Sequence, residues 1–173
     1  MTQIEWIYKN NPDNSARYIL GTKGQRTLFC FGINPSTATP EKPDPTIRKV
    51  ARIAEHNGYD SFIMVNVYPK RDTVFEKLED SVNDAEHLKN IAVITEAMAD
   101  HAQIDIWLAF GDHIYDRAYL PICLKDIYAR LPKERIRWFA TGVNKSGAPK
   151  HPLYQKNTAS FIAFDMLSYM KSL

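Results

Sequence analysis

Several side chains that can exchange hydrogen bonds with a ligand follow apolar segments of this sequence. Asn34 and Asn66 each come just after a short apolar run, and His151 lies in the loop that follows a third run. An asparagine amide offers both a donor and an acceptor, and an imidazole can donate a proton to an oxygen that gains negative charge. If these side chains meet, they could bind a polar ring and stabilise charge on it.

The apolar segments that position these side chains have the composition of buried strands. They are short and rich in aromatic and β-branched residues, and helical patterns separate them, which predicts a parallel sheet. The carboxyl ends of parallel strands share one edge, where α/β proteins place their ligand sites, so we expect the polar side chains to border one cavity there. Gly32 would let the backbone approach a ligand, and Pro35 would stiffen the turn. The predicted strands are residues 27–31, 61–67, 104–110 and 136–140.

Helical signals and a turn signal complete the predicted fold. Residues 17–20 and 27–31 read as a β-hairpin around the turn 21–24, which contains two glycines. The predicted helices are 45–57 (capped by Asp44), 81–101 (capped by Ser81 and Asp84), 114–130 (interrupted at Pro121) and 158–172 (capped by Asn157). We expect a three-layer α/β/α fold with a mainly parallel four-stranded central sheet and an N-terminal β-hairpin. Residues 1–173 would form a single domain.

Length and composition agree with one domain that has a buried core. The chain has 173 residues, of which 45% are hydrophobic and 24% are charged. Its net charge of +2 does not by itself indicate a nucleic-acid binder, but residues 135–164 contain Lys and Arg and no acidic residue. This segment is either a ligand-binding face or a solvated basic loop. No apolar run is long enough to span a membrane and the start lacks a signal peptide, so we expect a cytoplasmic protein without membrane partners.

The thiols and imidazoles of the chain have no metal-ligand spacing. Cys30 falls in a predicted strand and Cys123 in a predicted helix, so both are expected to be buried thiols of a reduced protein. No His stands at a metal-site spacing from another His, a Cys or a matched pair of carboxylates, and no glycine-rich phosphate loop is present. We therefore expect neither a metal nor a cofactor.

The order of these segments resembles the uracil-DNA glycosylase superfamily. Residues 32–36 are similar to its Gly-x-Asn-Pro-Gly motif, with Ser36 in the last position. The strand with which its members read uracil resembles residues 62–66, and its strand ending in Trp-Gly resembles residues 108–111. Its His-Pro-Ser-Pro motif resembles residues 151–154, of which the first two positions are the same. The resemblance implies a glycosylase-like fold.

A closer resemblance is to domain-of-unknown-function family 1643 (DUF1643), an uncharacterised bacterial and phage group. It extends over nearly the whole chain and implies a fold relative without an assigned activity. The segments that carry it are residues 34–38, 44–48, 65–66 and 151–154.

The glycosylase resemblance implies hydrolysis of an N-glycosidic bond without a metal. Such a site must place a water, stabilise a positive sugar and accept negative charge on the departing base. The catalytic candidates are Asn34, which would position the water, His151, which would donate to the base, and Asp44, the nearest acidic residue apart from Glu41. The substrate-binding candidates are Gly32, Pro35, Ser36, Asn66, Tyr68, Arg48 and Lys150. Asn66 would read the edge of the base, and the partner would be a nucleobase, nucleotide or nucleic acid, with DNA favoured over RNA.

Simpler roles and other functions stay open beside this reading. Asn34 could make a local turn, Asn66 could tie two strand ends together, and Asp44 could only cap a helix. His151 could be an ordinary loop histidine. Ser36 and the pair Leu153-Tyr154 depart from the glycosylase motifs. The alternatives are a binding module without catalysis and an enzyme that acts on a free small metabolite.

Overall fold

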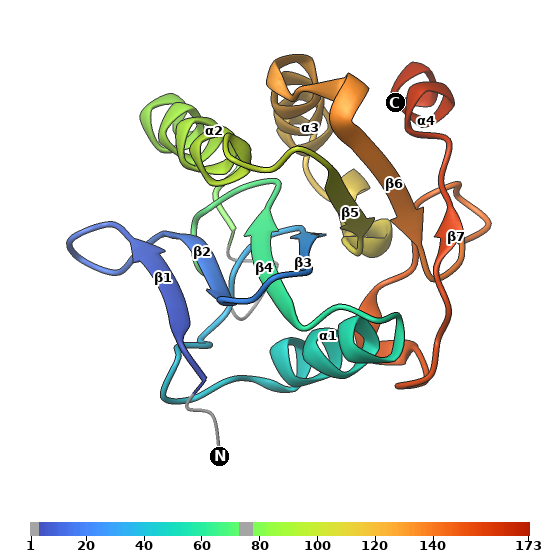
Figure 1. Ribbon diagram of the computed structural model, residues 1–173. Coiled ribbons are helices and arrows are strands. Elements are labelled where there is room, and N and C mark those ends of the chain that lie inside the picture. Colours follow the sequence, from blue (N-terminus) through green and yellow to red (C-terminus); the bar gives the residue numbers. More distant parts are fainter. Residues whose placement is uncertain (1–3, 73–77) are drawn as a thin grey trace.

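The computed structural model describes residues 4–72 and 78–173 and shows an α/β fold (Figure 1). Across these residues, four α-helices pack on a seven-stranded mixed sheet with the order β1-β2-β4-β3-β5-β6-β7. The start of the chain and the loop 68–80 are described only in part, because residues 1–3 and 73–77 lie outside the described residues. The strands are β1 (Trp6–Asn10), β2 (Arg17–Thr22), β3 (Thr27–Gly32), β4 (Ser61–Asn66), β5 (Ile104–Leu108), β6 (Ile136–Ala140) and β7 (Ile162–Ala163). The α-helices are α1 (Pro45–His56), α2 (Asp84–Met98), α3 (Tyr119–Arg130) and α4 (Met166–Ser172).

The central strands β4, β3, β5 and β6 are parallel, as predicted. β3 pairs with β4 on one side and with β5 on the other, and β5 pairs with β6. These segments form strands because helices cover both faces of a parallel sheet, so apolar side chains can be buried on either side of the backbone. In the register of β3 and β4, Gly32 lies opposite Asn66, so the two strands end together at one edge.

The predicted amino-terminal hairpin is wrong. β4 lies between β2 and β3, and β2 forms antiparallel pairs with β1 and β4 instead. The glycines that suggested a turn permit close approach to β4 and the residue before it. A Cβ on Gly21 would lie 2.3 Å from the carbonyl oxygen of Phe62, and one on Gly24 would lie 2.3 Å from Asp60 Oδ1. The sheet is larger than predicted, because β1, β2 and β7 extend its parallel centre.

Helix α1 forms as its sequence signals indicate. Asp44 Oδ1 accepts the Ile47 N–H at 2.8 Å, Pro45 occupies the first position, and Asn57 ends the helix. The proline fits there because the first N–H groups of a helix have no intrahelical partner. Local capping chemistry therefore fixes the start of α1, which stands beside the carboxyl edge of the sheet.

The other helices start at residues that tertiary contacts select. Asn83, not Ser81 with Asp84, caps α2 by accepting the Glu86 N–H at 3.1 Å, and the Tyr68 hydroxyl accepts the Asn83 N–H at 2.9 Å. The predicted helix 114–130 is a short 3₁₀ helix, η2 (Gly111–Tyr115), followed by α3, in which Pro121 lies in the first turn.

The last predicted helix starts several residues later than its pattern suggested. Residues 162–163 pair with β6 as β7, and Asp165, not Asn157, caps α4 by accepting the Ser168 N–H at 3.0 Å. Residues 162–163, which the helical pattern had included, therefore belong to an edge strand.

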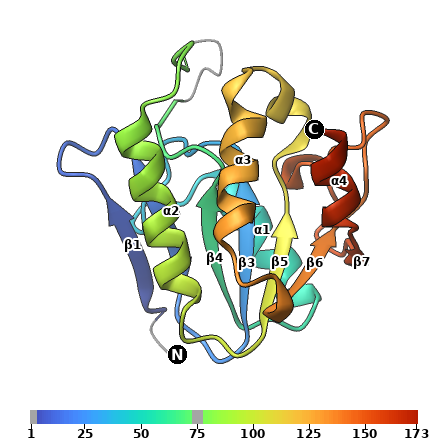
Figure 2. The ribbon, with the colours of Figure 1, turned by 90° about the horizontal axis from the view of Figure 1, so that it is seen from above.

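The helices cover both faces of the sheet and create two apolar cores (Figures 1 and 2). α1 packs on one face, while α2, α3 and α4 lie on the other. Cys30 and Cys123 are free and buried, as the sequence predicted, and Trp107 is also fully buried. No described helix has both the length and the apolar character needed to cross a membrane.

Candidate functional site

A cavity of about 190 Å³ lies where β3 and β4 end, on the face of the sheet that α1 covers. The loop from β3 to α1 and the first turn of α1 form part of its wall, and His113 and His151 close another part. The predicted site residues that line it are Gly32, Asn34, Ser36, Asp44, Asn66 and His151. The structure thus brings together side chains that are far apart in the sequence.

Asn66 presents an unpaired amide in this cavity. Its residue is 1% exposed, and neither Oδ1 nor Nδ2 has a hydrogen-bond partner among the described residues. A buried donor or acceptor left without a partner costs about 1–3 kcal/mol. The side chain therefore does not tie strand ends together, which was the simpler role considered for it.

Gly32 leaves the space that the Asn66 amide occupies. A Cβ on Gly32 would lie 2.8 Å from Asn66 Oδ1 and 2.6 Å from Met64 Cε. Real Cβ atoms do not approach other atoms so closely, so any side chain at position 32 would displace Asn66 or Met64. Gly32 shapes the site through its missing side chain.

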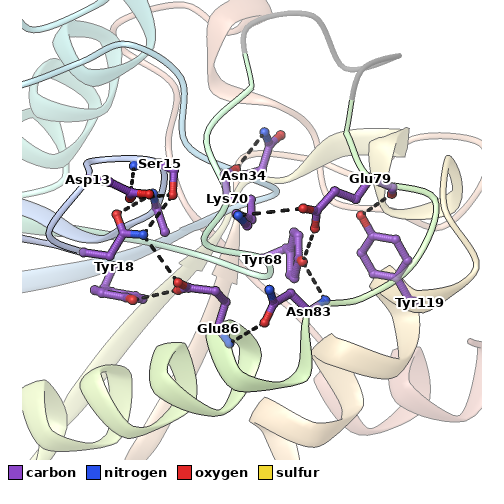
Figure 3. Close-up of polar contacts among 12 residues, drawn as sticks. Asp13, Ser15, Tyr18, Asn34, Tyr68, Lys70, Glu79, Asn83, Glu86 and Tyr119 are labelled. Atoms are coloured by element: carbon purple, nitrogen blue, oxygen red, sulfur yellow. Dashed lines mark hydrogen bonds and ion pairs between the residues drawn. The ribbon is translucent and has the colours of Figure 1, made fainter.

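Asn34 is oriented by backbone carbonyls of its own loop and of the loop after β4. Its Nδ2 lies 3.4 Å from the carbonyl oxygen of Pro35 and 3.3 Å from that of Asp72. It also lies 3.4 Å from the carbonyl oxygen of Lys70 (Figure 3). These contacts are long for hydrogen bonds, but together they turn the nitrogen towards the backbone. The Oδ1 atom accepts no hydrogen bond from the described residues, so it is the group that Asn34 can offer to a ligand or a water.

The loop after β4, which contacts Asn34, is anchored by side chains near the start of α2 (Figure 3). Lys70 forms an ion pair with Glu79, whose other carboxylate oxygen accepts the Tyr68 hydroxyl at 2.9 Å. Tyr68 is fully buried and stacks edge-on against Tyr119. It supports the loop from the core and does not line the cavity, so its expected contact with a ligand does not fit this structure.

His151 is held as a neutral imidazole with one free donor. Its Nδ1 accepts the Leu153 N–H at 3.2 Å, which assigns the ring proton to Nε2. Burial, followed by the charge of His113, lowers the pKa of His151, while Asp44 raises it. Gly111 supports this placement with a φ of +65°, and a Cβ there would lie 3.2 Å from His151 Cβ. The Nε2–H is suited to donate to a ligand oxygen.

The remaining residues of the loop after β3 have structural contacts. Asp44 caps α1 while also lining the cavity, so the capping role considered for it is present. Pro35 is buried, and its carbonyl oxygen accepts the Asp72 N–H at 3.1 Å. The Ser36 carbonyl oxygen accepts a hydrogen bond from Arg71. Through these contacts, Pro35 and Ser36 attach the loop after β3, which contains Asn34, to the loop after β4.

Arg48 and Lys150 lie beside neighbouring hollows. Lys150 lines a hollow of about 600 Å³ that shares His113 and His151 with the cavity. Arg48 lines another hollow, of about 350 Å³, beside Lys49 and Arg52. Within residues 4–72 and 78–173, no cluster of three or more His, Cys, Asp or Glu side chains could hold a metal ion.

Arg17, the first residue of β2, is a cavity residue that the sequence patterns did not predict. Arg17 lines the cavity and is 2% exposed, and its Nη1 donates to the Ala38 carbonyl oxygen at 3.1 Å. A lone arginine before an apolar run usually marks the exposed start of a strand. Its burial depends on the loop after β3 folding over it, which local patterns do not encode.

A family comparison decides where this chain belongs. The family model described as "Protein of unknown function (DUF1643)" matches residues 17–153. The chain belongs to the DUF1643 family. The DUF1643 match starts at Arg17 and includes every residue that lines the cavity. No curated protein and no solved structure matches the chain, so the likeness of this DUF1643 protein to uracil-DNA glycosylases stays a prediction.

Proposed function

We propose that the cavity binds the amide edge of a nucleobase, carried by a nucleotide or a nucleic acid, with DNA favoured over RNA. The observation that supports this most is the buried Asn66 amide, whose donor and acceptor both lack partners among the residues that the structure describes. A ring carbonyl next to a ring N–H offers the complementary pair of groups. Two such hydrogen bonds would remove the cost of burying the amide unpaired.

The size of the cavity favours a single base as the buried part of the ligand. Its volume of about 190 Å³ is below the roughly 300 Å³ at which pockets for drug-sized molecules begin. The hollow of about 600 Å³ beyond His151 could receive the sugar and the phosphate. Lys150 lines this hollow, where a cation would favour an anionic backbone.

A catalytic form of this proposal is N-glycosidic hydrolysis by a three-layer, glycosylase-like fold without a metal. The neutral His151 ring favours it, because Nε2–H could donate to a base oxygen as the bond to the sugar breaks. Asn34 Oδ1 would hold the attacking water by accepting a hydrogen bond from it. Asp44 Oδ1 is engaged by the helix N–H, so any role as a base would require its other oxygen.

Binding of free bases and nucleosides tests the recognition proposal directly. Isothermal calorimetry should detect uracil, hypoxanthine or their nucleosides, and Asn66→Leu should weaken that binding by about 1–3 kcal/mol. Asn57→Leu is the matched control, because Asn57 uses its amide on the Ile53 and Ala159 carbonyls and the Phe161 N–H. It should lose stability and keep its affinity. Equal affinity in Asn66→Leu and the unchanged protein would contradict the proposal.

A further inference from the structure

The cavity contains a buried cation that lacks an ionic partner. Arg17 is 2% exposed and forms no ion pair with a described carboxylate. Within its guanidinium, only Nη1 donates a hydrogen bond to a described residue, at 3.1 Å to the Ala38 carbonyl oxygen. Its Nε is buried and has no hydrogen-bond partner in the part of the chain that the structure describes. Arginines are almost never fully buried unless paired, and an unpaired buried charge is strongly destabilising.

A second guanidinium increases the positive potential at this point. Arg71 also donates to the Ala38 carbonyl oxygen, at 3.5 Å, and to that of Ser36. Its Nη2 donates to the Tyr8 hydroxyl and to Asn14 Oδ1, which are neutral groups, and its buried Nε has no hydrogen-bond partner among the described residues. Two cations therefore share one carbonyl oxygen beside the cavity.

The described acidic side chains near Arg17 form no ion pair with it. Asp44 and Asp72 both line the cavity, but Asp44 uses Oδ1 to cap α1. Burial lowers the pKa of Arg17 to about 10, and the repulsion from Arg71 is a larger effect than the attraction of Asp44. Arg17 thus lies buried in the cavity wall without an ion pair to a described residue, an arrangement that a negative group of a ligand would stabilise.

We propose that the Arg17 end of the cavity is an oxyanion site, which binds a phosphate or carboxylate group of the ligand. This inference rests on the proposed function in one respect, which is that the rest of the same ligand would bind the Asn66 amide. The free Nε–H and the neighbouring Nη2 form the edge of the guanidinium that is suited to two parallel hydrogen bonds with an oxyanion. The ligand class is then an anionic base or nucleotide, in which the charge is carried by the ring or by the phosphate.

Pairs of neutral and anionic probes distinguish these sources of charge. Orotate carries a carboxylate on the uracil ring, so its neutral parent is uracil. Uridine 5′-monophosphate carries a phosphate, so its neutral parent is uridine. Calorimetry at constant ionic strength should show at least one anionic probe binding roughly tenfold tighter than its parent, or more, since hydrogen bonds to charged groups contribute about 1.5–3 kcal/mol. Inorganic phosphate alone measures the oxyanion site without a base.

Arg17→Met should remove this gain, and Arg130→Met, an exposed arginine at the end of α3, should keep it. Arg17→Lys keeps the charge but lacks the planar guanidinium that can donate two parallel hydrogen bonds, so it should retain part of the gain. This variant preserves the test if Arg17→Met folds poorly. Thermal melting without ligand gives a second readout. Arg17→Met should melt at the same temperature or higher, because it removes an unpaired buried charge.

The outcomes separate this inference from the proposed function. Inorganic phosphate that binds only with Arg17 present, while uracil and uridine fail to bind, would support the oxyanion site and reject base recognition. Uridine that binds through Asn66, with no gain for either anionic probe, would reject the oxyanion site and keep base recognition. A gain that survives Arg17→Met would also overturn the inference.

Discussion

Two polar regions on opposite faces of the sheet use their buried groups differently. In the first, a tyrosine network made of Tyr18, Tyr68, Tyr119, Glu79, Asn83 and Glu86, the tyrosine hydroxyls are all hydrogen-bonded (Figure 3). In the second, the cavity, the two amide atoms of Asn66 and the buried Nε of Arg17 have no hydrogen-bond partner within residues 4–72 and 78–173. Buried polar groups in native proteins nearly always have partners.

The contrast indicates which region serves the fold and which serves a ligand. The tyrosine network joins β2, the loop after β4 and the start of α2 at the level of individual hydrogen bonds. The cavity holds polar groups at a cost that its own contacts do not offset. Natural proteins accept such local inconsistency mainly at functional sites.

Replacing His151 should have the largest effect on the cavity side of this comparison. If the neutral ring stabilises a departing base, His151→Ala should slow single-turnover base release by about 10²–10³-fold and change substrate affinity only a few-fold. The assay uses oligonucleotides that carry uracil, hypoxanthine or xanthine, in EDTA. His56→Ala, at the exposed end of α1, is the control. Release from no substrate by the unchanged protein, with selective binding retained, would favour a binding module.

Stability measurements can test directly whether the tyrosine network and the cavity differ. Tyr68→Phe removes a hydroxyl that contacts both Glu79 and the Asn83 N–H, so the free energy of unfolding should fall by about 1–3 kcal/mol. Asn66→Leu removes unpaired groups of similar volume and should leave that free energy unchanged or raise it. Urea denaturation measures both. A loss for Asn66→Leu as large as that for Tyr68→Phe would mean that the two regions do not differ.

Asp44 could serve both the fold and a ligand, since it caps α1 and lines the cavity. Asp44→Ala should lower the free energy of unfolding by about 1 kcal/mol, and Asp44→Ser should restore most of it, because serine also caps helices. If Asp44→Ser restores stability and the rate of base release together, the residue acts only through the fold. A rate that stays low in the stable serine variant would place its carboxylate in the chemistry.

The smallest effect concerns pH. The pKa of His151 is lowered in the folded state, so the unfolded chain binds a proton more readily at this residue. Stability from the neutral ring should therefore be complete above about pH 6.5 and be lost as the pH falls towards the lower folded pKa. His151→Asn, whose amide oxygen can accept the Leu153 N–H, should reduce this loss in denaturation curves between pH 7 and pH 5. An unchanged loss would show that the pH dependence does not come from His151.

Local sequence signals predicted those parts of the fold that depend on neighbours along the chain. The start and end of α1 follow from Asp44, Pro45 and Asn57, and the parallel strands follow from short apolar runs between helices. The pairing of β2 depended instead on β4, which comes about forty residues later. Gly21 was therefore interpreted as a turn residue, although it faces the β4 backbone.

The same distinction applies to the cavity. Asn34, Asn66 and His151 could be placed together because parallel strands end at one edge, a rule that needs only the strand order. Arg17 could not, because its burial depends on the loop at Ser36 to Ala38 covering it. Tyr68 follows the second strand directly, but its side chain enters the core, which the position in sequence does not reveal.

The outermost strands of the sheet have a consequence for self-association. β7 has two residues, and β1 has a register shift between Lys9 and Asn10. A short edge strand and an irregular one both offer few evenly spaced N–H and C=O groups to the backbone of another molecule. Extension of the sheet from one copy to the next is therefore disfavoured at both edges, and association between copies would have to use side-chain surfaces.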